Sequence, residues 1–168
     1  MATIADESRN VAAIRALLSQ VCDPELPMMT IEDMGILRAV EETPSGFRVT
    51  ITPTYSGCPA MNTIANDIRR TLNEHGLADV ELVEQLAPAW TTDWMSAEGR
   101  RKLREAGIAP PAEATTDKRH LLGITPVIEC PNCGSKATER VSEFGSTACK
   151  ALYRCTQCLE PFDYFKCI

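Results

Sequence analysis

Two C-x-x-C pairs near the end of the chain, Cys130/Cys133 and Cys155/Cys158, have the spacing of a metal site. Two thiolates separated by two residues sit on a tight turn, or knuckle, with both sulfurs facing one ion, and a second knuckle completes a tetrahedral four-sulfur shell. The alternatives are reduced structural thiols and a CxxC redox centre. Two matched knuckles favour the metal site, because such pairs rarely arise together.

The sequence leaves both the ligand set and the metal open. Cys149 and Cys167 flank the second knuckle and are candidates for additional or substitute ligands. Gly134 follows the first knuckle and lets it turn with its amides directed at sulfur, whereas Leu159 stands after the second, which we expect to be less regular. A closed four-cysteine site most often holds structural zinc, and the alternatives are iron or an iron-sulfur cluster. We favour zinc because a small module needs a staple.

Cys58 is a third candidate, in a segment that leaves a strand, turns and enters a helix at residues 52–59. Pro59 suits the first helical position, which places Cys58 close to the helix N-cap. The helix dipole and the free amides stabilise a thiolate there, so the thiol becomes a better nucleophile and a better ligand for soft metals. The alternative is an inert buried cysteine at the helix start.

A proline-rich turn at Cys22–Pro27 places two carboxylates, Asp23 and Glu25, at the end of the first helix. That end of a helix is unfavourable for anions, so we expect these acids either to face solvent or to have a partner. Without further information the turn indicates a helix stop, with Cys22 as an ordinary buried thiol.

The elements that must position these residues follow from the apolar spacing. Apolar residues at helical period predict one helix over residues 11–21 and a second from Pro59 to Gly76. Alternation predicts a hairpin and a third strand. The expected strands span residues 35–42, 46–52 and 80–86. Helices on one face of a small mixed sheet make an α+β fold, with a two-layer domain of about a hundred residues.

The domain organisation follows from composition. A short helix is expected from Ser96 to Glu105, before a proline-containing polar stretch. We therefore expect a first domain at 1–106, a linker at 107–125 and a separately folded β zinc ribbon at 126–168.

Composition and charge exclude several classes of function. The chain is 44% hydrophobic and 24% charged, and no apolar run reaches the roughly 20 residues needed to cross a bilayer. The N-terminus has no signal-peptide pattern, so we expect a cytoplasmic protein with reduced cysteines. Residues 106–168 hold seven acids and seven bases, which argues against nucleic-acid binding by the ribbon.

At this point several motifs together indicate a family. The residues that carry the resemblance are DPELP at 23–27, IEDMG at 31–35, TPTYSGCP at 52–59, APAWT at 87–91, FGSTACK at 144–150 and EPFDYFKC at 160–167. Residues 10–105 resemble the SufT-like metal-sulfur cluster biosynthesis domain. With the ribbon, the whole chain resembles the PaaD (PaaJ) family of accessory proteins encoded with bacterial phenylacetyl-CoA ring epoxidases.

The resemblance implies a maturation factor for that epoxidase of phenylacetate catabolism, one that assists iron-sulfur cluster or iron-centre assembly. It implies that Cys58 transiently holds iron or a cluster, with Asp23 and Glu25 shaping its acidic surroundings. The implied partners are the di-iron oxygenase and iron-sulfur reductase of the epoxidase system, or the iron-sulfur assembly machinery.

Two other classes of function compete with this interpretation. The chain could instead be a structural or electron-relay subunit of the oxygenase complex. A catalyst acting on phenylacetyl-CoA is not expected, because the sequence has no phosphate-binding glycine loop and no acid, base and nucleophile set joined by spacing. Whether the chain forms a homodimer is left open.

Overall fold

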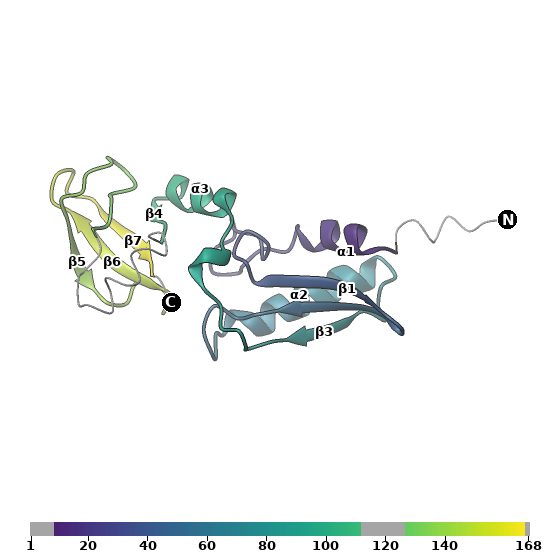
Figure 1. Ribbon diagram of the computed structural model, residues 1–168. Helices are drawn as coiled ribbons and strands as arrows, with labels where there is room; N and C mark the ends of the chain where they lie inside the picture. Colours follow the sequence, from purple (N-terminus) through teal and green to yellow (C-terminus); the bar gives the residue numbers. More distant parts are fainter. Residues whose placement is uncertain (1–8, 112–126, 167–168) are drawn as a thin grey trace. The chain divides into compact units, whose positions relative to one another are not determined.

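The computed structural model describes residues 9–111 and 127–166 of the 168-residue chain. Contacts divide the chain into two compact units, Met1–Trp90 and Thr91–Ile168. The described residues form three α-helices, one 3-10 helix and two small mixed sheets (Figure 1). This architecture confirms the expected α+β fold.

The sheet of the first unit has the strand order β1-β2-β3. Strands β1 (Leu37–Thr43) and β2 (Gly46–Ile51) form the predicted antiparallel hairpin, and β3 (Glu81–Glu84) pairs with β2 in parallel. Of the alternating residues Phe47, Val49 and Ile51, the last two are buried and Phe47 is half-buried, while Thr50 between them is buried as well. The hairpin therefore turns one apolar face toward the core.

Two helices complete the first unit. Helix α1 (Val11–Leu18) begins at Asn10, whose side chain accepts a hydrogen bond from the amide of Ala13, and it ends three residues before the expected Val21. Helix α2 (Ala60–Glu74) ends before Gly76, which has a φ of 73°. Helix α1 contacts both α2 and β1, and Ile14, Leu18, Ile64 and Ile68 are buried.

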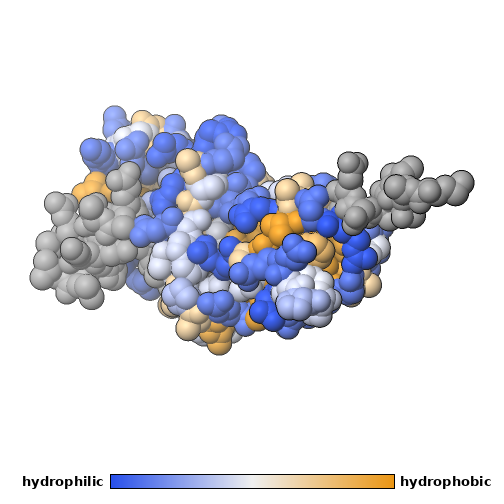
Figure 2. Space-filling view, turned by 45° about the vertical axis from the view of Figure 1, so that its right-hand side comes forward, coloured by the Kyte–Doolittle hydropathy of each residue, from blue (hydrophilic) through white to orange (hydrophobic). Residues whose placement is uncertain are grey.

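Polar side chains cover much of the visible surface, with smaller apolar patches between them (Figure 2).

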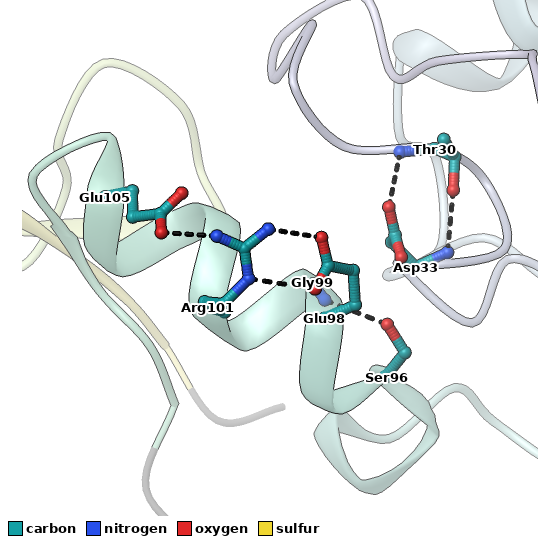
Figure 3. Close-up of polar contacts among 7 residues, drawn as sticks. All are labelled: Thr30, Asp33, Ser96, Glu98, Gly99, Arg101 and Glu105. Atoms are coloured by element: carbon teal, nitrogen blue, oxygen red, sulfur yellow. Dashed lines mark hydrogen bonds and ion pairs between the residues drawn. The ribbon is translucent and has the colours of Figure 1, made fainter.

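The second unit begins with η1 (Thr92–Trp94) and α3 (Ala97–Glu105). Ser96 caps α3 by accepting a hydrogen bond from the amide of Gly99, and Arg101 pairs with Glu98 and Glu105 on the exposed face of the helix (Figure 3). Both contacts support the helix predicted at Ser96–Glu105.

The sheet of the second unit has the order β4-β7-β6-β5. Its strands are β4 (Ile108–Ala109), β5 (Thr138–Ser142), β6 (Lys150–Cys155) and β7 (Pro161–Phe165). Strands β5, β6 and β7 are antiparallel neighbours, and β4 pairs with β7 in parallel. The sheet buries Ile128, Tyr153, Phe162 and Tyr164 together with Cys130 and Cys155, so the cysteine site is continuous with the apolar core of the unit.

The compact units differ from the domains expected from sequence. Helix α3 lies in the expected first domain and β4 in the expected linker, yet both belong to the second unit, because β4 pairs with β7 and α3 contacts β4. Linker residues 112–125 lie outside the described part of the chain. The limits 1–106, 107–125 and 126–168 for independently folding domains stay a prediction.

Among the described residues, no helix is long and apolar enough to span a bilayer.

Candidate metal centre and the loop end of the first sheet

The two cysteine knuckles have the same backbone turn. The amide of Cys130 donates to the carbonyl of Ser135 at 2.9 Å, and the amide of Cys155 donates to the carbonyl of Glu160 at 3.0 Å. Gly134 and Leu159, the residues that follow the second cysteine of each knuckle, have φ values of 73° and 66°. The second knuckle is therefore as regular as the first, although the sequence suggested otherwise, because Leu159 adopts the left-handed conformation without being glycine.

The four knuckle thiols converge on one point. The Sγ atoms of Cys130, Cys133, Cys155 and Cys158 all lie within 4.8 Å of one another. The distance between the Sγ atoms of Cys133 and Cys155 is 3.6 Å, and that between Cys130 and Cys158 is 3.8 Å. Four sulfurs bound tetrahedrally at about 2.3 Å from one ion stand about 3.8 Å apart. The thiols thus form a metal-binding group whose spacing fits a single tetrahedral ion.

Backbone amides stabilise negative charge within this group. The amides of Cys158 and Gln157 both donate to the Sγ of Cys155 at 3.4 Å. These hydrogen bonds lower the pKa of the Cys155 thiol to about 6, with the amide of Cys158 making the largest contribution. Amide donors of this kind are what a thiolate ligand requires, because they offset part of its charge.

The additional cysteines have different positions. Cys149 is buried and is not part of the four-thiol group, and its Sγ lies 3.0 Å from the hydroxyl of Thr147. Cys167 lies outside the described residues, so its proposed role as an additional ligand stays a prediction.

The first unit gathers the other motifs at one end of its sheet. Because β1 is antiparallel to β2 and β3 is parallel to it, the start of β1 and the ends of β2 and β3 lie at the same end. The segments attached there are 22–36, 52–59 and 85–90, and together we call them the loop end. Topology therefore brings together three segments that are far apart in sequence and that carry four of the motifs quoted above.

Hydrogen bonds tie these segments to one another. The indole of Trp90 donates to the carbonyl of Met34 at 2.9 Å, and Trp90 is almost fully buried. The amide of Thr52 donates to the carbonyl of Ile36 at 2.9 Å. Residues 34–36 are thus held from two sides, by the segment that contains Cys58 and by the segment that ends at Trp90.

Cys58 lies two residues before α2, next to the N-cap residue Pro59, and is partly exposed. Its amide donates to the carbonyl of Tyr55 at 3.2 Å, and its carbonyl accepts from the amide of Met61 at 3.2 Å. Pro59 has helical backbone angles with no N–H, in keeping with its expected place at the helix start. The thiol is thus accessible at the N-terminus of a fifteen-residue helix.

Asp23 is buried and holds the proline-rich turn together. Its Oδ1 accepts hydrogen bonds from the amides of Glu25 at 2.7 Å and Leu26 at 3.0 Å. Glu25 is half-buried. Within residues 9–111 and 127–166, the ribbon cysteines are the only group of three or more His, Cys, Asp or Glu side chains close enough to share an ion. Cys58, Asp23 and Glu25 do not form such a group.

Two polar arrangements were not anticipated from sequence. Thr30 and Asp33 bond reciprocally, each side chain accepting the other residue's amide (Figure 3), and the T-x-x-D spacing could have revealed this pattern, which has the form of a capping box but closes a turn. Lys150 is buried beside Asp163, with 3.2 Å between Nζ and Oδ2. No local spacing signals that pair, because its members come from different strands.

Comparison with known proteins finds two family models in the chain. Residues 11–84 match the model described as "Iron-sulfur cluster assembly protein", and residues 114–166 match "PaaD zinc beta ribbon domain". The chain thus joins two modules that are each recognised separately.

Individual relatives agree with these matches. The chain is 51% identical to a putative 1,2-phenylacetyl-CoA epoxidase subunit of Escherichia coli, covering 100% of this chain and 98% of that protein. It is 34% identical to an Fe-S protein maturation auxiliary factor of Porphyromonas gingivalis over 52% of this chain and 84% of that protein. A crystal structure of a domain of unknown function, DUF59, from Bacillus anthracis aligns with a TM-score of 0.50 and 26% identity, over 55% of this chain and 90% of that one.

Proposed function

The chain belongs to the family of this putative 1,2-phenylacetyl-CoA epoxidase subunit of Escherichia coli, and on this premise we propose that it is a maturation factor for such an epoxidase. It would assist the assembly of the iron-sulfur or iron centres of that multicomponent enzyme. The name of the relative that matches over the whole chain supports a role in the epoxidase system. The match of residues 11–84 to an iron-sulfur cluster assembly protein, together with the maturation factor that is similar over 52% of the chain, supports assembly as the role.

The observation that carries this proposal is the position of Cys58. A partly exposed thiol stands at the start of α2, within the loop end where the family's motifs meet. A cysteine thiolate is a ligand for iron, and the exposure of this thiol leaves it open to a metal ion. Cys58 would bind iron or a cluster as cargo. It would release this cargo by ligand exchange, because a thiolate of the client protein can take the place of the Cys58 thiolate on the iron. Asp23 and Glu25 would keep the surroundings acidic.

We assign zinc to the ribbon, held by Cys130, Cys133, Cys155 and Cys158. In a four-iron cluster each thiolate binds a different iron, so the sulfurs stand farther apart than when all four share one ion. A spread of at most 4.8 Å supports a single ion. The ribbon core is small, and zinc would staple it without redox chemistry. The ribbon then serves as a scaffold that recognises or positions the client.

The proposed partners are the di-iron oxygenase and the iron-sulfur reductase of the epoxidase system, or the iron-sulfur assembly machinery, in the cytoplasm. The name of the full-length relative places that protein with the epoxidase.

The test replaces Cys58 in cells that lack the native copy. Cys58→Ser should lose most of the epoxidase activity and lower the iron content of the purified epoxidase. Cys22→Ser is the matched control, because Cys22 is also a half-buried thiol of the first unit. Full activity with Cys58→Ser would rule out the cargo role.

A second candidate function is a structural or electron-relay subunit of the oxygenase complex. The word "subunit" in the name of the relative favours it. A stable subunit should co-purify with the oxygenase in a one-to-one ratio, whereas a maturation factor should not. An electron relay requires redox-active iron, so protein purified without oxygen should be coloured and should bleach on reduction. Colourless protein with about one zinc per chain supports the scaffold role.

A further inference from the structure

The four ribbon thiols are not equally accessible. Cys130 and Cys155 are buried and Cys158 is half-buried, whereas Cys133 is exposed. An oxidant that reaches the group from solvent therefore meets Cys133 first. Exposure and thiolate character together determine which cysteines are oxidised, and metal ligation holds a cysteine in its thiolate form.

The thiol near Cys133 belongs to the other knuckle. The Sγ of Cys155 lies 3.6 Å from that of Cys133, and two backbone amides stabilise its negative charge. Cys130 and Cys158 form a similar pair at 3.8 Å. A disulfide needs the two sulfurs to approach to about 2.05 Å, so the Sγ atoms of Cys133 and Cys155 must move about 1.6 Å closer together.

We propose that Cys133 is an oxidation site for hydroperoxides, and that its oxidation joins it to Cys155 and releases the ribbon's metal ion. The Cys133 thiolate attacks the peroxide, the O–O bond breaks, and a sulfenic acid and one alkoxide or hydroxide are formed. The Cys155 thiolate then attacks the sulfenic sulfur, an S–S bond forms and a second hydroxide leaves. Two thiolates are oxidised by two electrons and one peroxide is reduced, so the step balances.

Loss of two of the four ligands releases the ion. The remaining pair, Cys130 and Cys158, supplies half of the tetrahedral shell, which is too little to retain zinc against a chelator. The new bond links residues before β5 to the end of β6, so it ties the two knuckles together as the metal did. A bond within one knuckle would not do this. Oxidation therefore exchanges a metal staple for a covalent one.

This inference rests on the proposed metal-binding role of the ribbon, but it does not require the maturation role of Cys58. The experiment uses the purified full chain loaded with zinc, one equivalent of hydrogen peroxide and a chromogenic chelator. We expect one zinc to be released per chain with the loss of two titratable thiols. Mass spectrometry of the unreduced digest should show a bridge between Cys133 and Cys155.

Matched variants distinguish the pairing. Cys133→Ser and Cys158→Ser each remove one ligand, but only Cys158→Ser keeps the reactive pair. Cys158→Ser should still form the bridge, whereas Cys133→Ser should consume peroxide at least about tenfold more slowly. Cys149→Ser removes a buried thiol outside the group and should behave like the unmodified chain.

Three outcomes would overturn the proposal. These are a bridge within a knuckle, a bridge that includes Cys149, and zinc release no faster with peroxide than with the chelator alone. Protein that binds no metal would count against the proposed zinc site itself. Metal that is bound and resists peroxide would count against the oxidation step alone.

Discussion

Gly134 and Leu159 occupy equivalent positions in the two knuckles, and both adopt the left-handed backbone conformation, with φ values of 73° and 66°. For glycine this conformation has no steric penalty, whereas a side chain costs about 1–2 kcal/mol there. The side chain of Leu159 is 61% exposed, so its packing contacts offset little of this conformational cost. The same hydrogen bond closes the turn around both residues, from the amide of Cys130 to the carbonyl of Ser135 and from the amide of Cys155 to the carbonyl of Glu160.

Leu159→Gly should therefore stabilise the metal-loaded ribbon. We expect the free energy of unfolding to rise by about 0.5–1 kcal/mol, because relief of strain outweighs the greater entropy of glycine in the unfolded chain. Denaturant unfolding followed by circular dichroism measures it. Val141→Gly is the control, because Val141 is similarly exposed in β5 without a positive φ, and it should lower stability. A loss of stability with Leu159→Gly would contradict the strain argument.

Removing the metal should unfold the ribbon and leave the first unit folded. Cys130 and Cys155 lie in the ribbon core, so loss of the ion removes the link that holds the two knuckles together at the end of the sheet. Amide hydrogen exchange should show that β6 loses protection in the presence of a strong chelator, while α2 keeps it.

A ligand variant should reproduce this result without a chelator. Cys155→Ser should weaken metal binding by more than about 100-fold, because loss of a ligand costs more than loss of its supporting hydrogen bonds. Cys149→Ser should retain the metal. Equal metal content in the two variants would contradict the four-thiol assignment.

The buried pair Lys150–Asp163 should contribute strongly to the stability of the ribbon. The side chain of Lys150 is 6% exposed and that of Asp163 is 24% exposed, so Lys150→Met leaves a largely buried carboxylate with the hydroxyl of Ser146 but without its cationic partner. We expect a loss of about 3 kcal/mol in the free energy of unfolding. Arg140→Ala breaks an exposed pair with Glu143 and should cost less than about 1 kcal/mol. Equal losses would show that burial does not govern the contribution of these pairs.

The local elements could be predicted because their signals are local. Alternating apolar residues such as Val49 and Ile51 indicate a strand. A glycine that follows an apolar helical pattern indicates the end of the helix, and Gly76, with a positive φ, ends α2 in this way. The two knuckles follow from spacing for the same reason. The turn at Leu159 was not predicted, because the turn closed by the hydrogen bond from the amide of Cys155 to the carbonyl of Glu160 overrides the preference of the residue itself.

The contacts that build the loop end could not be derived from spacing. Trp90 and Met34 are 56 positions apart, and only the pairing of β3 beside β2 brings them together. The buried position of Lys150 could not be predicted either, because a lysine is usually found at the surface and its partner Asp163 lies on another strand. The family resemblance pointed to the motifs of the loop end without supplying these contacts.

Asp23→Asn separates the structural role of Asp23 from its charge. The Oδ1 of Asp23 accepts amides from Glu25 and Leu26, and asparagine offers the same oxygen without the charge. Asp23→Asn should therefore change stability by less than about 1 kcal/mol, whereas Asp23→Ala should lose about 1–3 kcal/mol because two amides lose their acceptor. If the acidic surroundings of Cys58 matter, Asp23→Asn should still lower epoxidase activity in cells that lack the native copy. Full activity would assign Asp23 to the turn alone.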